Sequence, residues 1–464
     1  MLKKSTIILG AGFTGLSAGY LLSKKGYNVT IIELLPHPGG IGSEIVDNGN
    51  RYEMGAHLFH CPDKKIMEDI KSLVGQELIK INRTIKINFN GKYYDFPLKL
   101  HEILINLPIS IVLRAGFSFV FHQLKPIFSK NKKSNTEEVL INSYGRVLYE
   151  IFFKSYIKHV WGISPNKFSP KFAQQRIPNF NILEIFSKIK KYLYFKIIDN
   201  KPVDIKNYAE KVEGDLYTTR EGFSGIAKII ANKILDNGGN IIYNARVETI
   251  ELGDDNKIYS IDYLKKNERY SIKLDGLIST IPISSMVKMV KPKIKKPIII
   301  QSVEKIKYRS LVFVGFIVEG EKKLPGDLTY YRNLSFNRLT DLTSIGLEEN
   351  LNNTKTIIAE ITCDIHDKVW QDDNLAKKLV FDDIEKEDIF EIKNIIHSHV
   401  FRLKHAYPIY LKGFDESLDS IYQYLNSIPN IITTGRQGNF QYINSHIAIR
   451  YGYNAANKII EYYN

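Results

Sequence analysis

Residues 4–42 read KSTIILGAGFTGLSAGYLLSKKGYNVTIIELLPHPGGIG, and this stretch decides the fold. Residues 5–9 are an apolar run that predicts a buried strand. Glycines in the spacing G-x-G-x-x-G follow directly, at Gly10, Gly12 and Gly15. A helical pattern comes next, and a second β-rich run, residues 28–32, leads into Glu33. Strand, glycine turn, helix, strand and acid in this order predict a dinucleotide-binding βαβ unit.

The glycine turn leaves room for a bound pyrophosphate. Gly10 makes the tight turn, Gly12 lets the backbone approach the phosphates, and Gly15 lets helix and strand pack closely. Phe13 and Thr14 lie between these glycines at the start of the helix. The N-terminus of that helix offers unpaired N–H groups to negative charge. We therefore predict that these five residues contact the cofactor.

An acid and a second glycine group narrow the choice of cofactor. Glu33 lies about 20 residues after the glycine turn, where it can accept hydrogen bonds from an adenosine ribose. Gly39 and Gly40 follow closely and allow a second near approach of the backbone. A simple NAD-binding unit has no obvious need of them.

With this acid-then-Gly-Gly pattern the sequence resembles the flavoenzymes grouped around amine oxidases, protoporphyrinogen oxidase and UDP-galactopyranose mutase. The resemblance extends over essentially the whole chain and implies tightly bound FAD. The implied fold class is α/β (α+β overall). It combines a Rossmann-like FAD/NAD(P)-binding domain with a parallel sheet and an interleaved substrate domain with a mixed or antiparallel sheet and a helical insertion.

Composition limits the class of protein. The 464 residues carry a formal charge of +14, which favours an acidic partner such as a phosphorylated substrate. No nucleic-acid-binding motif is visible, and Lys and Arg are dispersed, so we expect no nucleic-acid partner. Two cysteines and no Cys/His spacing predict neither a disulfide framework nor a metal site. We expect a cytoplasmic protein because no secretory signal precedes the first strand.

The most apolar stretch, residues 103–121, is interrupted by Pro108 and Arg114. A membrane-spanning helix is therefore not expected. A packed helix followed by an exposed loop is the favoured interpretation. The basic segment at residues 125–133 leaves peripheral contact with the inner membrane surface as the alternative.

Small residues beside histidines mark a candidate catalytic segment at residues 55–60, Gly-Ala-His-Leu-Phe-His. UDP-galactopyranose mutases carry a similar segment beside the flavin. The resemblance implies that Gly55, Ala56 and His57 contact the cofactor and that His57 takes part in catalysis. His60 is the second choice.

Several aromatic residues and arginines become substrate candidates through the same resemblance. The motif Tyr-x-x-x-x-Trp-Gly that contains Trp161, followed by Arg176, is similar to the mutase and its relatives. In the mutase a second arginine, four residues after the first, meets the substrate diphosphate. Phe180 occupies that position here. A phenylalanine cannot bind phosphate through two hydrogen bonds as an arginine does, which argues against strict mutase activity. Arg332 matches an arginine that touches substrate phosphate, which makes it a substrate-binding and catalytic candidate.

The C-terminal part returns to the cofactor. The Gly435-Arg436 turn and the helix start at Asn444 are similar to the mutase branch, in which a helix N-terminus points at the flavin. Tyr442 matches a substrate-phosphate tyrosine and is also assigned to the cofactor. The remaining implied residues are Tyr407 and Tyr410 for the substrate and Val247 beside the adenine.

Three functions stay open. The first is an FAD-dependent oxidoreductase that acts through flavin N5 on a phosphorylated, nucleotide- or lipid-linked sugar in cell-envelope polysaccharide biosynthesis. The second is a mutase that uses reduced FAD without net redox change. The third is a non-catalytic flavoprotein at a membrane surface. The electron acceptor and the oligomeric state are left open.

We expect interleaved domains. The predicted FAD-binding domain comprises residues 1–90, 205–290 and 400–464. Residues 91–204 are predicted as a helical region for substrate or membrane contact, and residues 291–399 as a substrate-binding sheet domain. No repeat or Pro-rich linker separates them.

Overall fold

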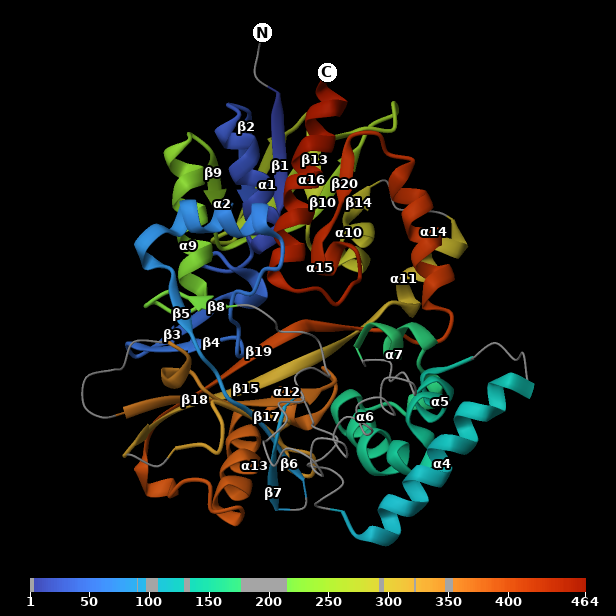
Figure 1. The fold of residues 1–464 in the computed structure, drawn as a ribbon. Helices are drawn as coiled ribbons and strands as arrows, with labels where there is room; N and C mark the ends of the chain where they lie inside the picture. Colours follow the sequence, from blue (N-terminus) through green and yellow to red (C-terminus); the bar gives the residue numbers. More distant parts are fainter. Residues whose placement is uncertain are drawn as a thin grey trace.

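The computed structural model describes residues 4–89, 91–96, 107–128, 134–176, 215–291, 296–320, 323–346 and 354–464. Side chains in α4 are described as far as residue 123. Figure 1 shows a nucleotide-binding part that holds both termini, above a part built on a long, twisted sheet and a group of helices.

A five-stranded parallel sheet forms the centre of the upper part, in the order β20-β13-β1-β2-β9. Its strands, in chain order, are β1 (Ser5–Leu9), β2 (Asn28–Ile32), β9 (Asn240–Ile242), β13 (Gly276–Ser279) and β20 (Ile431–Thr433). Helices cover one face: α1 (Phe13–Lys24), α2 (Lys64–Val74), α9 (Ser224–Asp236) and α16 (Ser445–Tyr463). The predicted first βαβ unit is present with the expected strands.

A second sheet covers the other face, in the order β12-β11-β10-β14. Its strands are β10 (Ala245–Leu252), β11 (Ile258–Lys265), β12 (Glu268–Lys273) and β14 (Val290–Lys291). Ile8 faces the helices, whereas Ile7 and Leu9 join the core against this second sheet. Because both faces of β1 are buried, its sequence is a continuous apolar run.

The lower part is built on a seven-stranded sheet in the order β19-β15-β18-β17-β16-β6-β7. Its pairs are antiparallel except for the parallel pair β16–β6. The strands are β6 (Ile85–Phe89), β7 (Lys92–Asp95), β15 (Lys307–Glu319), β16 (Leu328–Tyr330), β17 (Arg338–Asp341), β18 (Thr354–Cys363) and β19 (Ile395–Ile409). Helix α13 (Asp373–Lys386) packs on this sheet through a core that includes Phe316 and Val380.

A group of helices stands beside this sheet. It contains α4 (Ile109–Phe128), α5 (Thr136–Leu148), the π-helix η3 (Tyr149–Lys154), α6 (Ser155–Trp161) and α7 (Pro170–Arg176). Gly162 ends α6 with φ 67°, in the region that favours glycine, and Pro170 is the first residue of α7, where its missing N–H costs nothing. Within the described residues, no helix combines the length and apolarity needed to span a membrane.

Short elements connect these parts. The hairpin β3 (Glu44–Asp47) and β4 (Asn50–Glu53) and the pair β5 (Ile79–Ile81) and β8 (Leu216–Thr218) lie between the two large sheets. The remaining helices are α10 (Ile283–Met289), α11 (Pro297–Lys305), α12 (Lys368–Gln371), α14 (Phe414–Asn426) and α15 (Gly435–Gly438). Short 3₁₀ turns complete the elements: η1 (Gly40–Gly42), η2 (Gly75–Glu77), η4 (Pro165–Lys167), η5 (Thr343–Ile345) and η6 (Ile392–Asn394).

The predicted fold class is confirmed: a parallel sheet is combined with mixed and antiparallel sheets and a helical group. The domain limits stay predictions. Strand β6 lies before the predicted limit at residue 90 but pairs in the seven-stranded sheet, and β19 crosses the predicted limit at residue 400.

Close packing of α16 on α1 yields a test of the core. A Cβ atom on Gly452 would lie 2.3 Å from the carbonyl oxygen of Thr14, so Gly452→Ala must push the two helices apart. We predict a loss of about 1–3 kcal/mol in the free energy of unfolding, measured by urea denaturation. The control is Gly116→Ala in α4, where a Cβ meets nothing within 4 Å. Helix propensity should make that change neutral or stabilising by up to about 1 kcal/mol. Equal effects of the two substitutions would contradict the packing argument.

Candidate functional site

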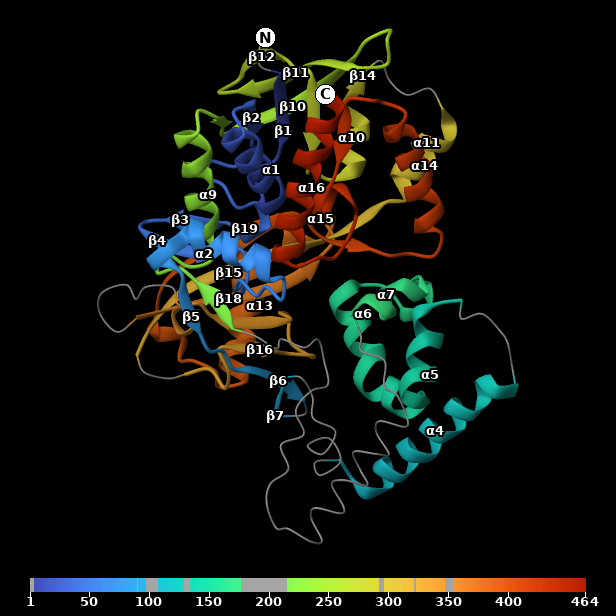
Figure 2. The ribbon, with the colours of Figure 1, turned by 45° about the horizontal axis from the view of Figure 1, so that its top comes forward.

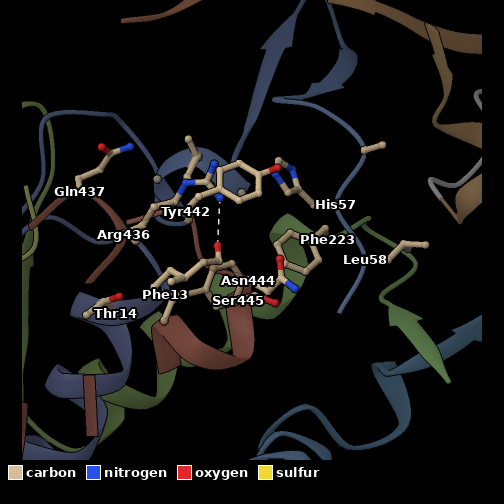
Figure 3. A pocket seen from close by; sticks show the side chains of 18 of the residues that line it. Phe13, Thr14, His57, Leu58, Phe223, Arg436, Gln437, Tyr442, Asn444 and Ser445 are labelled. Atoms are coloured by element: carbon tan, nitrogen blue, oxygen red, sulfur yellow. Dashed lines mark hydrogen bonds between the residues drawn. The ribbon is translucent and has the colours of Figure 1, made fainter. Parts of the chain in front are cut away.

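A cavity of about 360 Å³ opens where the glycine turn, the second glycine group and the N-terminus of α16 meet (Figure 3). Its floor is backbone, because Gly10, Gly12, Gly39 and Gly40 all line it. Aromatic side chains, imidazoles and three guanidinium groups form much of the rest of its wall: Phe13, His57, His60, Arg83, Phe223, Arg338, Arg436 and Tyr442.

The glycine turn works by close backbone contact. A Cβ on Gly15 would lie 1.9 Å from the carbonyl oxygen of Gly10, so any other residue would displace α1 from β1. Gly10 itself has φ 95°, in the region that favours glycine. The N–H of Gly39 donates to the carbonyl of Ala11 at 2.8 Å, which fixes the second glycine group against the first. Gly15 is thus a packing residue behind the cavity.

Glu33 occupies the position that the βαβ pattern predicts, at the edge of the same cavity. Its carboxylate accepts hydrogen bonds from the N–H groups of Ala11, at 2.5 Å, and Leu35, at 2.8 Å. Burial raises the pKa of Glu33, and these N–H groups oppose the rise. Each carboxylate oxygen retains a lone pair for a ligand hydroxyl.

Two helix N-termini point toward the cavity. Phe13 and Thr14 open α1, and Asn444 and Ser445 open the 19-residue α16. Neither first turn contains an acid. The positive ends of both helix dipoles are therefore available to an anion such as a pyrophosphate or an electron-rich ring.

A second chamber of about 500 Å³ adjoins the first. The two share Ala56, Arg83, Arg338, Tyr407 and Tyr442 as lining residues. Aromatic side chains from three parts of the chain line the rest, among them Phe89, Phe152, Tyr156, Trp161 and Tyr330. A molecule in this chamber can therefore reach one in the first cavity.

Arginines gather around the junction, and few carboxylates balance them. Arg338 pairs with Glu360, its register partner on β18, through Nε at 2.8 Å and Nη2 at 2.5 Å. Burial opposes the charge of Arg338, but Glu360 outweighs it and holds the pKa well above its usual value. Gly55 leaves space for this pair, since a Cβ there would lie 3.2 Å from Glu360 Oε1.

Arg83 and Arg332 have no carboxylate partner among the described residues. Burial lowers the pKa of both guanidinium groups. Arg332 donates to the carbonyl of Ile151 at 2.7 Å and stacks on the ring of Phe89, while its Nε and Nη1 have no partner. Arg83 lines both chambers. Buried, unbalanced cations of this kind favour an anionic ligand.

His57 lines the first cavity, and its ring lies 5.5 Å from that of Phe223. Burial lowers the pKa of His57 to about 3, and the positive charges of Arg338 and Arg436 add to the effect. The imidazole is therefore neutral at physiological pH and acts through hydrogen bonds. Its buried Nδ1 has no partner in the protein.

Arg436 holds the segment that leads into α16. It donates to the carbonyl of Ile443 at 3.0 Å and stacks on the ring of Tyr442, 4.3 Å from its centre (Figure 3). Tyr410 lies in the core behind this segment, where its hydroxyl accepts from the N–H of Tyr442 at 3.1 Å. Tyr410 therefore supports Tyr442 from outside both chambers.

The structure brings most of the predicted residues together. The first cavity is lined by Gly10, Gly12, Phe13, Thr14, Glu33, Gly39, Gly40, Ala56, His57, Arg436, Tyr442 and Asn444. The second is lined by Trp161, Arg332, Tyr407 and Tyr442. Gly15, Gly55, Val247, Gly435 and Tyr410 lie outside both linings. The side chain of Arg176 and the whole of Phe180 lie outside the described residues.

Sequence reasoning missed Arg83, Phe223, Tyr330, Arg338 and Glu360. Arg338 begins the short strand β17 (Arg-Leu-Thr-Asp) and gives no sequence signal, but Glu360 interrupts an apolar run in β18. Charged residues in such positions are almost never fully buried unless they are paired. Arg83 and Phe223 had no comparable signal, because they come from irregular segments that only the tertiary fold brings to the cavity.

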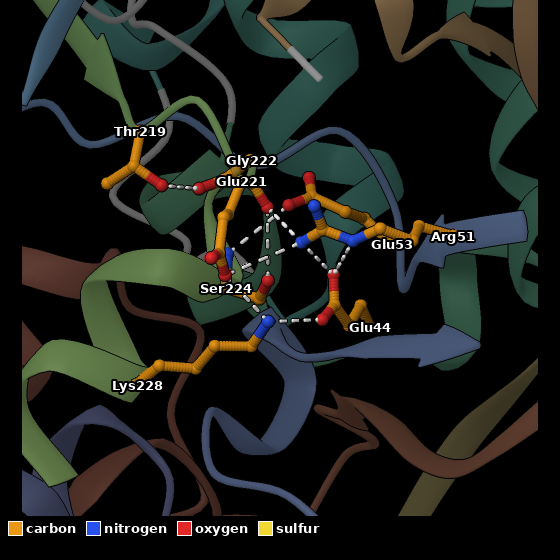
Figure 4. A network of polar contacts seen from close by, with 8 residues as sticks. All are labelled: Glu44, Arg51, Glu53, Thr219, Glu221, Gly222, Ser224 and Lys228. Carbon is orange, nitrogen blue, oxygen red and sulfur yellow. Dashed lines mark hydrogen bonds and ion pairs between the residues drawn. The ribbon is translucent and has the colours of Figure 1, made fainter. Parts of the chain in front are cut away.

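A partly buried polar network joins the β3–β4 hairpin to residues on either side of Phe223 in sequence, among them Glu221, Ser224 and Lys228 (Figure 4). Glu44 accepts from Arg51 at 2.6 Å and pairs with Lys228 at 2.6 Å, and Lys228 also pairs with Glu221. Glu53 accepts from the N–H of Ser224 at 3.2 Å. The network thus ties the β3–β4 hairpin to the start of α9, which carries Phe223 into the cavity.

Comparisons with known proteins agree with this geometry. Residues 13–346 match the family model of flavin containing amine oxidoreductases. This chain belongs to that family.

The individual relatives have low sequence identity to this chain and match only part of it. The chain is 27% identical over 181 residues to a protein from Klebsiella pneumoniae named probable UDP-galactopyranose mutase, and the match covers 38% of this chain and 46% of that protein. It is 28% identical over 177 residues to dTDP-fucopyranose mutase from Escherichia coli, covering 37% and 45% of the two chains. The chain thus spans less than half the length of these two relatives.

A solved structure of reduced UDP-galactopyranose mutase superposes with a TM-score of 0.82 at 18% identity, covering 99% of this chain and 96% of the other. Putrescine oxidase bound to putrescine superposes with a TM-score of 0.61 at 14% identity, covering 99% of both chains. At these identities the superpositions establish the shared fold. Together with the family, they confirm FAD as the predicted cofactor.

The cavity fits FAD, since it combines a backbone cradle, two helix N-termini and a carboxylate, Glu33, where a ribose is expected. We predict that Glu33→Gln weakens FAD binding by about 10- to 100-fold, because one amide N–H₂ must face a backbone N–H. Fluorescence titration of the flavin-free protein measures this. Glu385→Gln, an exposed residue on α13 in the lower part of the molecule, is the control and should bind as wild type. Unchanged affinity of Glu33→Gln would remove the carboxylate from the cofactor site.

The Glu53 carboxyl yields a pH prediction. Burial raises its pKa from 4.5 to about 8, and the Ser224 and Phe223 N–H groups only partly oppose this. The folded protein therefore holds a proton that the unfolded chain releases above pH 4.5, and stability must fall as pH rises from about 4.5 to about 8. Glu53→Gln should remove this fall. The free energy of unfolding of the variant, measured with urea, should therefore rise relative to that of wild type between about pH 5 and about pH 8. A constant difference across that range would contradict the assignment.

Proposed function

We propose that this chain is an FAD-dependent enzyme that acts on a phosphorylated sugar, carried by a nucleotide or a lipid, in cell-envelope polysaccharide biosynthesis. The observation that supports it most is the second chamber, where the described lining residues include Arg83, Arg332 and Arg338 but only one carboxylate, Glu360, beside the FAD cavity. Two relatives, from Klebsiella pneumoniae and Escherichia coli, are named as mutases of sugars.

The charge balance favours a phosphate or diphosphate. Arg338 is neutralised by Glu360, which leaves Arg83 and Arg332 without a carboxylate within the described residues. A phosphate oxygen accepts charge-assisted hydrogen bonds from guanidinium groups in such positions. The unpartnered Nε and Nη1 of Arg332 are the donors that a ligand would satisfy.

Aromatic side chains suit the remainder of such a substrate. Trp161, Phe152 and Tyr330 present flat surfaces on which a base, a sugar ring or an isoprenoid can pack. Tyr407 and Tyr442 stand at the junction of the two chambers, with ring centres 5.7 Å apart. They are placed to orient the sugar toward the FAD cavity and to exclude water.

His57 is the proposed catalytic residue on the cofactor side. Because its imidazole is neutral, it can hold a proton at one nitrogen and accept at the other without adding charge. FAD supplies the redox chemistry when bound, and the protein supplies position and electrostatics. Arg332 is the proposed catalytic contact on the substrate side, and the unpredicted Arg338 lies nearer the junction.

A mutase reaction with reduced FAD and no net redox change is the second candidate. The two mutase relatives favour it. It needs cationic and tyrosyl groups on a diphosphate, and Arg83, Arg338 and Tyr442 line a chamber that offers them.

Flavin absorbance separates the candidates. Anaerobic bleaching of the oxidised protein by a sugar nucleotide or sugar phosphate would support net oxidation. Perturbation of the dithionite-reduced flavin by UDP or dTDP, with a UDP-sugar isomerised and no bleaching, would support the mutase. Absence of both responses with nucleotide-linked and lipid-linked sugars would contradict both candidates.

Substitution of Arg83 tests directly whether the second chamber binds a phosphorylated ligand. We predict that Arg83→Ala weakens binding of UDP to the reduced protein by about 10- to 100-fold, because one charge-assisted hydrogen bond is lost. Calorimetric titration measures the affinity. Arg246→Ala removes an equal charge from an exposed position on β10 and is the control. If both variants lose affinity equally, the effect comes from overall charge and Arg83 does not contact the ligand.

A further inference from the structure

Helix α4 presents an apolar face to solvent. Its large exposed side chains are Ile109 (74% exposed), Leu113 (57%), Phe117 (78%), Val120 (41%) and Phe121 (64%). They recur at intervals of three and four residues, so they share one side of the helix. We call these five residues the α4 face. Figure 2 shows α4 along the outer edge of the molecule, on the far side of α5 from the sheets.

The opposite side of α4 is fixed to α5. Ala115 is buried there, and the side-chain amide of Gln123 donates to the carbonyl of Asn142 at 3.0 Å. Gly145, at φ 77°, lets α5 approach closely, since a Cβ there would lie 2.7 Å from the backbone nitrogen of Phe119. The helix is therefore anchored, and its apolar face is held outward.

An exposed apolar surface of this kind indicates a binding partner. Contiguous exposed apolar patches on soluble proteins mark interaction sites. Nothing in the part of the chain that the structure describes covers the α4 face. No described helix, α4 included, is long and apolar enough to cross a membrane. A helix with one side anchored and the other apolar fits an interfacial position at a bilayer.

The charge of the sequence around α4 indicates which partner binds the α4 face. Between Glu102 and Glu137 the sequence contains no Asp or Glu, whereas it contains five Lys and Arg residues. Arg114 is exposed on α4 itself, beside Leu113. A second copy of the chain would bring two such positive segments together, which is unfavourable. An anionic lipid surface attracts them and accepts the apolar side chains.

We infer that the α4 face docks this protein on an anionic membrane surface, with Leu113 and Phe117 in the acyl boundary and Arg114 at the headgroups. This docking is independent of the proposed reaction.

Vesicle co-sedimentation of the whole, FAD-loaded chain tests the inference. Wild type should bind vesicles of phosphatidylcholine mixed with phosphatidylglycerol, bind weakly to phosphatidylcholine alone, and dissociate with added salt. Leu113→Ser combined with Phe117→Ser should weaken binding by about 10- to 100-fold. The control is Leu235→Ser combined with Tyr259→Ser, two exposed apolar residues on α9 and β11, and it should bind as wild type.

Two further measurements separate membrane docking from misfolding and from dimer formation. Arg114→Glu should weaken binding to the anionic vesicles alone, and all variants should keep wild-type flavin content and urea midpoints. Wild type that stays in solution with both vesicle types overturns the inference, as does equal binding of the α4 and control variants. Sedimentation equilibrium that shows a dimer broken by the α4 substitutions would assign the face to a second copy instead.

Discussion

Contact between backbone atoms at Gly10 and Gly15 is the constraint on which the nucleotide-binding part depends. It sets the distance between β1 and α1, and the N-terminus of α1 then points into the cavity. The same turn receives the second glycine group, since Gly39 donates to Ala11, and the floor of the cavity becomes bare backbone. Side chains would fill that floor. Because glycines leave out the Cβ atoms there, the floor has room for the close approach of a charged cofactor.

The second chamber differs from the first, because charged side chains gather there, whereas the floor of the first cavity has no side chains. Glu360 and Arg338 face each other across β17 and β18, so the sheet register creates one balanced pair. Arg83 and Arg332 arrive from other segments without carboxylates. Their desolvation is unfavourable for the empty protein and is relieved when an anion binds. In the proposed function, the backbone and the helix dipoles of the first chamber bind FAD, whereas the guanidinium groups and aromatic rings of the second bind the substrate.

Local sequence predicted the parts of the site that local geometry creates. The glycine turn, Glu33, the second glycine group and His57 all lie in segments where spacing or a short motif carries the signal, and all line the cavity. Phe223, by contrast, lines the cavity from the start of α9, which the Glu44–Lys228 pair ties to a hairpin far away in sequence. Arg338 was missed because it begins a short strand, β17, and its pairing with Glu360 on β18 depends on the register of the two strands. Tyr410 matches a motif by type, yet its ring stacks on Phe414 in the core.

The helical group links the α4 face to the substrate chamber. Helix α4 is fixed to α5, and α5 continues directly into the π-helix η3. That π-helix carries Phe152 and Phe153 into the wall of the chamber, and widened turns of this kind are frequent at functional sites. A protein docked through α4 would hold its aromatic chamber at a fixed height above the headgroups, where phosphorylated, lipid-carried sugars are presented. A nucleotide-carried substrate gains nothing from such a position, because it diffuses freely. Membrane docking therefore bears on the choice of carrier, although it leaves the reaction at FAD unchanged.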